Sequence, residues 1–312
     1  MKIKYIFLIP VFAGLFTACQ DALEQPLKFD VTVEPAAGVS ITDSVITAAK
    51  GTTVKFNFAG EPDFISFAYE RFLPTNATLS FSTQAAWGTH IENTLSVYAS
   101  ESFTGLLLND FEKDSTAVST HSWIDVSAMS NLPTVTNTKQ KAEISVNDYR
   151  GKTLTIAFRY KTDFVADWQP TWIVSDLQID NTLTTDNSKV STYLAATMGF
   201  SPFDMLNKTA AYNSESLAGV WYINNPATME IKRTARDNAL NHDWLISKPI
   251  EIPLGQTENS EVTSVKNISN RVENYSYTFS NVGEYTVKFN AVNQNYVHSE
   301  STEKTIKIRI TE

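Results

Sequence analysis

The sequence predicts an all-β protein built from β-sandwiches. Apolar and polar side chains alternate with a period of two in several stretches, most clearly between Lys152 and Asn181, as in sheets with one buried face. The 312 residues include 18 Phe and 12 Tyr, and only 19% of them are charged. This composition favours sheets over helical bundles, and turn signals between the strand patterns indicate a sandwich.

The stretch from Lys152 to Asn181 contains two predicted strands on either side of a polar loop. The first strand runs to about Thr162 and the second from Trp172 to Asp180. One face of each strand is apolar and predicted to be buried. These faces hold Leu154, Ile156, Phe158 and Tyr160 in the first strand, and Ile173, Leu177 and Ile179 in the second.

The C-terminal segment predicts three more strands with the same alternation. Tyr285 follows the turn at Gly283 and opens a late strand, where immunoglobulin-like sandwiches place a tyrosine whose hydroxyl bonds the backbone. We therefore expect a structural role for Tyr285. The predicted buried faces hold Tyr275, Tyr277 and Phe279, then Tyr285, Val287, Phe289 and Ala291, and last Ile306, Ile308 and Ile310.

Residues 186–218 are less regular than the rest and are rich in Ser, Thr, Asn and Ala. Within them, Ser191 to Met198 is interpreted as a short helix. No heptad pattern is sustained and no solenoid period is visible.

The N-terminus has the pattern of a secretory signal. Lys2 and Lys4 precede the apolar run from Tyr5 to Phe16, which is too short for a permanent membrane span. The run ends at Phe16-Thr17-Ala18-Cys19, which resembles the lipobox of bacterial lipoproteins, although Phe16 replaces the usual Leu. The resemblance implies a signal peptide over residues 1–18, lipidation of Cys19 and anchoring to a membrane. The alternative is an ordinary cleaved signal with an unrelated cysteine.

Charge and cysteine content exclude some functions. The net charge is −9 and the chain has no Lys/Arg run, which argues against nucleic-acid partners and against electrostatic binding to anionic membranes. Because Cys19 is the single cysteine, an intrachain disulfide is excluded.

Several short motifs resemble domains of bacterial surface proteins. Tyr277-Thr278-Phe279 and Gly283-Glu284-Tyr285-Thr286-Val287 resemble the last strands of PKD domains, an immunoglobulin-like module. Val54 to Tyr69 resembles the early strands, without the usual Trp-Asp-Phe-Gly-Asp-Gly segment. Trp123-Ile124-Asp125-Val126 and Asp243-Trp244-Leu245-Ile246-Ser247 resemble the jelly-roll domains found beside PKD modules in Bacteroidetes.

With the lipobox, this order resembles the Bacteroidetes lipoproteins grouped as domain of unknown function 5017. The resemblance covers nearly the whole mature chain. It implies an outer-membrane, cell-surface location and a gene beside a glycan-import system of the SusC/SusD kind. It implies no activity, because none is assigned to the family.

These resemblances divide the chain into five segments, with two arrangements left open. A single PKD-like sandwich could be split by an inserted jelly roll, since chain ends often lie close together; alternatively, two immunoglobulin-like units are present and one is truncated. Contacts between residues 54–58 and 285–289 would favour the insertion. The segments are the signal peptide (1–18), a tether (19–28), the first PKD-like part (29–73), the jelly roll (74–254) and the second PKD-like part (255–312).

The sequence predicts no enzyme and no metal centre. Its four His residues lack zinc-ligand spacing, and it has neither a Gly-rich phosphate loop nor a Gly-x-Ser-x-Gly elbow. Clustered carboxylates leave three alternatives: a solvated face, a structural calcium site or a glycosidase pair. Of these we favour the solvated face. The carboxylates concerned are Asp163, Asp167, Asp176 and Asp180.

Tryptophan is the side chain on which sugar rings stack, while neighbouring polar groups bond the hydroxyls. Trp168 lies in a polar loop and is the first candidate, with Asp163, Asp167 and Gln169 beside it, and Trp87 is the second. Packing in the core is the competing role for each tryptophan. It is the expected role of Trp123, Trp172 and Trp244, whereas Trp221 is left undecided.

These features favour a lipid-anchored, non-catalytic surface protein that binds polysaccharide or oligosaccharide, with outer-membrane uptake proteins as further partners. The alternative is a structural or adhesive protein that binds another protein through an apolar patch or a strand edge. A glycoside hydrolase without recognisable motifs is the third, least favoured hypothesis.

Overall fold

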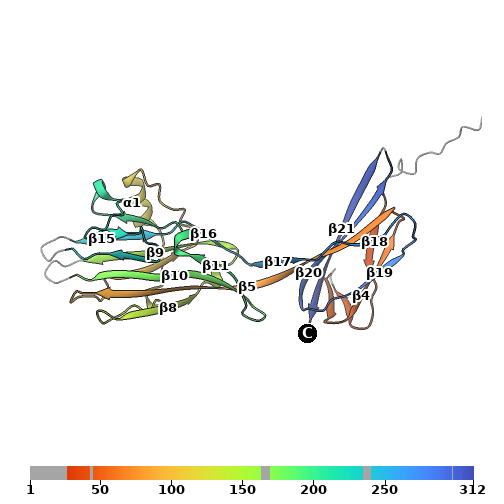
Figure 1. Cartoon of the computed structure of the whole chain (residues 1–312), viewed down its shortest axis with the longest axis horizontal. Helices are drawn as coiled ribbons and strands as arrows, with labels where there is room; N and C mark the ends of the chain where they lie inside the picture. The colour runs from red at the N-terminus through yellow and green to blue at the C-terminus, as the bar shows by residue number, and fades with distance from the viewer. Residues whose placement is uncertain (1–26, 43–44, 163–168, 235–239, 297) are drawn as a thin grey trace, which may run out of the picture. The chain divides into compact units, whose positions relative to one another are not determined.

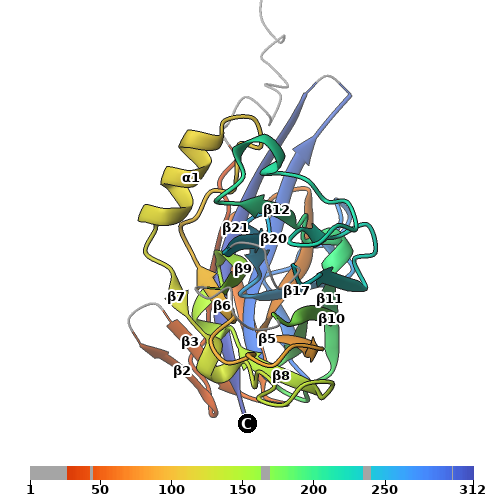
Figure 2. The same cartoon turned by 90° about the vertical axis from the view of Figure 1, so that its left-hand side faces the viewer.

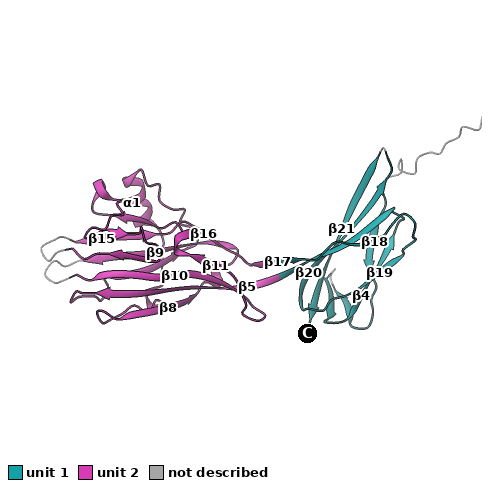
Figure 3. Ribbon diagram, viewed as in Figure 1, with its two compact units in different colours: residues 1–72, 257–312 teal, residues 73–256 magenta. Residues whose placement is uncertain are grey.

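A computed structural model describes residues 27–42, 45–162, 169–234, 240–296 and 298–312. The prediction of an all-β fold with sandwich-like sheets is confirmed (Figure 1). The described residues form two compact units. Unit 1 comprises the residues up to 72 and those from 257 onward, and unit 2 comprises residues 73–256 (Figure 3).

Unit 1 contains two groups of strands. One is the three-stranded sheet β1-β4-β19, and the other is the series β20-β21-β3-β2, in which β21 pairs with β3 in parallel. The first part of β5 pairs with β20 and with β18. The strands are β1 (Asp30–Val33), β2 (Val39–Thr42), β3 (Val45–Ala49), β4 (Thr53–Ala59), β5 (Phe64–Ala86, residues 64–72 in this unit), β17 (Gly255–Asn259, residues 257–259 in this unit), β18 (Thr263–Lys266), β19 (Asn274–Thr278), β20 (Gly283–Gln294) and β21 (Ser299–Thr311).

Aromatic side chains from both ends of the chain build the core of unit 1. The ring centroids of Phe56 and Phe58 lie 5.0 and 5.2 Å from that of Phe289. Phe67 lies 4.8 Å from Tyr277 by the same measure. The early strands and the late strands therefore share one hydrophobic core.

Tyr285 has the structural role that its position predicts. Its ring is buried and its hydroxyl donates a hydrogen bond to the backbone oxygen of Asn281, 2.8 Å away. This bond fixes the turn that leads into β20.

Unit 2 contains two sheets. The first has the order β13-β14-β10-β5, with β8 also on β5 and β11 also on β10, and the second has the order β12-β15-β9-β6-β7, with β16 also on β9. The strands not yet given are β6 (Leu95–Ser100), β7 (Ile124–Asp125), β8 (Lys139–Ser145), β9 (Lys152–Thr162), β10 (Thr171–Leu183), β11 (Lys189–Leu194), β12 (Ser201–Asp204), β13 (Trp221–Tyr222), β14 (Thr228–Ile231), β15 (Asn241–Ile246) and β16 (Ile250–Ile252).

The two sheets of unit 2 enclose a large apolar core. Phe81 of β5 meets Phe158 of β9 edge-to-face, with ring centroids 5.3 Å apart. The predicted inward face of β9 is confirmed, since its four members are fully buried. They are Leu154, Ile156, Phe158 and Tyr160.

The predicted inward face of β10 is wrong at one position. Trp172 and Val174 are buried in the core, whereas Ile173 is only half-buried. The pairing with β5 shifts register between Ser175 and Gln178, and Asp176 has a φ of 54°. This bulge adds a residue to β10 and reverses the alternation, so that Leu177 and Ile179 point inward.

The helical content differs from the prediction. Residues 191–194 belong to β11, and only Ala195–Thr197 form a 3-10 turn. The helix α1 (Phe111–Thr120), which was not predicted, is visible beside the second sheet in Figure 2. Asp110 caps α1 by accepting a bond from the Lys113 amide.

Replacing Phe289 by Ala should destabilise unit 1, because the ring contacts both early and late strands. We expect a loss of about 3–5 kcal/mol in the free energy of unfolding. All six tryptophans lie in residues 73–256, so tryptophan fluorescence reports unit 2 and far-ultraviolet circular dichroism reports both units. Urea titration should show F289A shifting the dichroism transition more than the fluorescence transition, and F158A should do the reverse. Equal shifts by both probes would contradict the separation into two cores.

Candidate functional site

Trp87 is an exposed aromatic residue at one end of unit 2. It follows the last residue of β5, where Ala86 pairs with Thr171 at the start of β10. Its side chain is 64% exposed, and its backbone has a left-handed φ of 63°. Such a φ is uncommon for a bulky residue and requires support from the surroundings.

The support comes from the next residue, Gly88. Its φ is 80°, and a Cβ at this position would lie 2.7 Å from the backbone nitrogen of Pro170. Only glycine therefore permits the two backbones to approach so closely. The contact fixes Trp87 against the segment that enters β10.

Gln169, a predicted ligand-binding residue, lies in the interior with 2% exposure. Its Oε1 accepts hydrogen bonds from Asn241 Nδ2 (2.6 Å), from the Thr234 hydroxyl and from the Tyr160 hydroxyl (3.3 Å). The structure thus places Gln169 in the interior, with its backbone against Gly88 and its side chain connecting three chain segments.

The same network continues beneath the end of the sandwich. The Asn241 amide donates to Thr162 Oγ1 (3.0 Å), and Trp172 Nε1 donates to Thr94 Oγ1 (2.9 Å). The Tyr160 hydroxyl is also within 3.1 Å of the Pro170 carbonyl oxygen. Buried polar groups that are bonded in this way hold a single arrangement of the segments around Trp87.

Asp243 is a buried carboxyl next to this network. It is 3% exposed, it pairs in register with Tyr160 and with Asp204, and its Oδ2 has no hydrogen-bond partner among the described residues. Burial, reinforced by the negative charge of Asp204, raises the pKa of Asp243 to about 9. The carboxyl is therefore protonated at neutral pH. Burial also raises the pKa of the Tyr160 phenol.

Of the three tryptophans expected in the core, two are buried and Trp123 is only half-buried. Trp172 and Trp244 are 1% and 4% exposed. Trp123 is half-buried and packs on Phe103 and Trp244. Trp221, which was left undecided, is 1% exposed.

The candidate carboxylates of β10 form ion pairs and hydrogen bonds with neighbouring side chains. Asp176 is exposed and pairs with Lys139 at 2.7 Å, and this bond lowers the pKa of Asp176. Asp180 accepts from Thr192 (2.6 Å) and pairs with Lys189 (2.9 Å). Within the described ranges, no three His, Cys, Asp or Glu residues are grouped as metal ligands.

Four predicted residues lie outside the described residues: Cys19, Asp163, Asp167 and Trp168. In the part of the chain that is described, no helix has the length and apolar character needed to cross a membrane.

Unit 1 has a polar hollow of about 660 Å³ on its surface. It is bordered by Arg271, which is paired with Glu61 and Glu273. Its aromatic member, Phe58, is packed on Phe289 in the core. The hollow therefore has no free aromatic face on which a sugar ring could stack. The end of unit 2 that carries Trp87 is the better candidate site.

Sequence reasoning missed the buried network, although one signal was present. Tyr160 and Asp243 both fall on inward positions of alternating strands, where a polar side chain must find a partner. Asn241 and Thr234 gave no such signal, because their partners are distant in sequence.

Replacing Asp243 by Asn should change the pH dependence of stability. The carboxyl has a pKa of about 9 in the folded protein and about 3.9 in an unfolded chain. The folded state therefore holds an extra proton between pH 4 and 9, and the free energy of unfolding falls by up to about 1.4 kcal/mol per pH unit as the pH rises.

Urea denaturation from pH 5 to 8 should show that the free energy of unfolding of D243N lacks this pH-dependent loss. The stability of D243N relative to the wild type should therefore increase as the pH rises. D176N, at an exposed carboxylate, serves as the control and should leave the slope unchanged. Parallel curves for D243N and the wild type would show that Asp243 is ionised in the folded protein.

The comparisons with known proteins identify a family but no function. No curated protein and no solved structure matches this chain. The family model described as a domain of unknown function, DUF5017, matches residues 18–200, which is more than half of the chain. The chain belongs to the DUF5017 family.

Proposed function

We propose that this protein is a non-catalytic, lipid-anchored surface protein that captures glycan at the end of unit 2 that carries Trp87. The single observation on which the proposal depends is the indole of Trp87, 64% exposed on a rigid backbone. The partner is a polysaccharide or oligosaccharide that an outer-membrane uptake system of the SusC/SusD kind would import.

The chemistry of Trp87 fits this partner. An indole that is already held in place loses little conformational entropy when a sugar ring stacks on it. Nearby, the Gly88 and Pro170 backbones and the network around Gln169 keep the surface fixed. A preformed platform of this kind favours binding of a flat, neutral sugar face.

The sequence supports a lipid anchor at Cys19 and an origin of the protein in Bacteroidetes. Phe16-Thr17-Ala18-Cys19 has the lipobox pattern, and the order of PKD-like and jelly-roll motifs resembles lipoproteins of Bacteroidetes. A tether from residue 19 to residue 28 would connect the lipid to unit 1. An outer-membrane location at the cell surface follows from this proposal.

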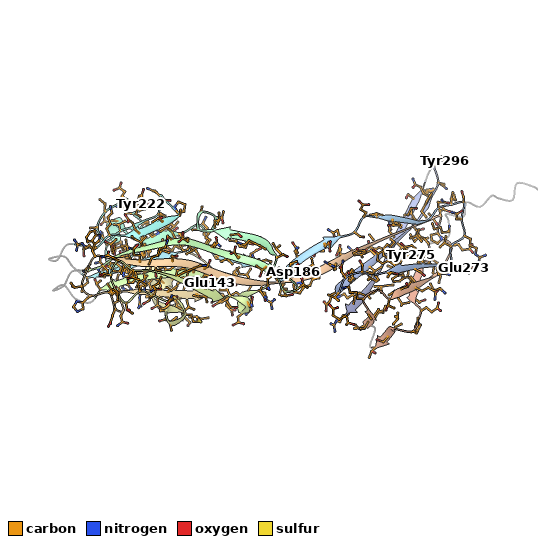
Figure 4. The ribbon with its side chains drawn as sticks, turned by 60° about the horizontal axis from the view of Figure 1, so that its bottom comes forward. Glu143, Asp186, Tyr222, Glu273, Tyr275 and Tyr296 are labelled. Carbon is orange, nitrogen blue, oxygen red and sulfur yellow. The ribbon has the colours of Figure 1, made fainter. Side chains whose placement is uncertain are left out.

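A second candidate function is adhesion to another protein. Tyr296, at the turn between β20 and β21, is 98% exposed (Figure 4). Ile41 on β2 and Val45 on β3 are each more than 40% exposed, and exposed strands of this kind can pair with a partner. A folded protein that binds no glycan would favour this candidate.

Replacing Trp87 by Ala should weaken glycan binding at least about tenfold, because truncating a central aromatic contact typically costs 2 kcal/mol or more. Affinity electrophoresis against a polysaccharide panel would select a ligand, and isothermal titration with its oligosaccharide would give the affinity. W87F should retain part of the binding. L217A, at an apolar residue that is 50% exposed, is the matched control. Unchanged affinity of W87A would refute the site, and no binding by the folded wild type would refute the function.

Replacing Cys19 by Ser should abolish lipidation, because the hydroxyl is not a substitute for the thiol in this modification. Expressed in a Bacteroidetes host, the wild type should partition into the detergent phase of a Triton X-114 extraction and incorporate radiolabelled palmitate. C19S should do neither. Palmitate labelling of C19S equal to that of the wild type would contradict the anchor.

A further inference from the structure

The outward face of the second sheet of unit 2 carries an aromatic cluster that does not include Trp87. Ser96, Arg159 and Trp244 form one cross-strand row over β6, β9 and β15. Tyr98 lies in the next row, 5.3 Å from Trp244 between ring centroids. Trp123, which precedes β7, stacks on Trp244 at 5.5 Å with 30° between the ring planes.

Contacts with the covering segments hold these rings in place. Trp123 Nε1 donates to the Val118 carbonyl oxygen of α1 at 3.1 Å, and Phe103 packs on Trp123 at 4.8 Å. Trp244 Nε1 donates to His242 Nε2 at 3.2 Å. Trp123, Arg159 and His242 nevertheless remain half-buried rather than enclosed, so they form the margin between the covered and open parts of the face.

Arg159 is the unusual member of the cluster. Its guanidinium carbon lies 5.1 Å from the ring centre of Tyr98 and 5.7 Å from that of Trp244. Nη2 donates to Ser96 Oγ at 3.3 Å, while Nε has no acceptor among the described residues. Over those same residues, no carboxylate forms an ion pair with it. A half-buried cation without a counter-charge is costly, because its desolvation is only partly compensated by ring faces.

The outward face around Arg159 has few charged groups. Lys161 and His242 form the adjacent outward row. The outward positions of β6, β9 and β15 hold no acidic residue, and on β7 the exposed Asp125 lies opposite Tyr98. Arg159 is therefore a cation without a counter-charge among the described residues, which favours an anionic ligand.

We propose that this face binds the carboxylate of a hexuronate residue in an acidic glycan, through Arg159. The inference rests on the proposed glycan capture and adds a second site with a defined substrate class. The planar guanidinium can donate two parallel bonds to a carboxylate. A purely structural role would need only packing, which a methionine side chain could supply.

The test compares two ligands that differ only in charge. The probe is tri-galacturonate, and its carboxyl-reduced counterpart has the same rings without the anion. Isothermal titration of the wild type should show binding of tri-galacturonate that weakens as NaCl rises, since the contact is half-exposed. The reduced trimer should bind at least about tenfold more weakly, as expected for loss of a charged hydrogen bond.

The variant R159M keeps the aliphatic packing and should lose about 10- to 100-fold in affinity for tri-galacturonate. R159K keeps the charge without the planar fork and should lose less. R309M, at an exposed arginine of unit 1 that pairs with Glu284, is the matched control and should bind as the wild type. Urea titration followed by tryptophan fluorescence would show that each variant is folded.

The outcomes separate this site from the one at Trp87. W87A should retain tri-galacturonate binding, and R159M should retain the binding of any neutral glycan found in the panel. Equal affinities of the wild type for the charged and the reduced trimer, or unchanged affinity of folded R159M, would overturn the inference. Either result would leave the test of Trp87 intact, because that test measures the binding of a neutral glycan.

Discussion

Strand β9 is the element on which unit 2 depends, because its inward face is buried and its outward face is covered over part of its length. Its inward face supplies Phe158 and Tyr160 to the core between the sheets, and its outward face supplies Ala157 to the cluster under α1. Where a strand is buried on both sides, it contributes more apolar area than an edge strand and fixes its neighbours on both sides. β6 and β15 pair directly with it, so their outward residues are positioned by the same strand.

Where β9 reaches the end of the sandwich, it buries polar side chains, which destabilise the fold unless they form hydrogen bonds. Tyr160 and Thr162 occupy inward positions, and they are stabilised by the Gln169, Asn241 and Pro170 groups that surround them. Asp243 avoids ionisation instead, since burial favours its neutral form. The result is a buried, hydrogen-bonded polar network at the end of the sandwich that carries the exposed indole of Trp87.

The sequence predicted the parts of the fold that repeat with a period of two. The inward face of β9 followed from the local alternation, and the role of Tyr285 followed from its place after a glycine turn, as in immunoglobulin-like sandwiches. The bulge at Asp176 did not, because a single extra residue in β10 leaves the alternation on either side intact while reversing its phase. Helix α1 was also not predicted, because its residues are mostly polar. Val118 is buried only because the helix packs over the second sheet. The polar network and the cation–aromatic cluster required tertiary contacts between segments far apart in the chain, which one sequence does not reveal.

Protection of Trp87 by a bound glycan tests the central claim most directly. N-bromosuccinimide oxidises exposed indoles first, and peptide mass spectrometry can assign the oxidised residue. Without ligand, Trp87 should be oxidised much faster than the buried Trp172, Trp221 and Trp244. With a saturating oligosaccharide, oxidation of Trp87 should slow while the others remain unchanged. Saturated glycan binding with no change in the oxidation of Trp87 would contradict the account.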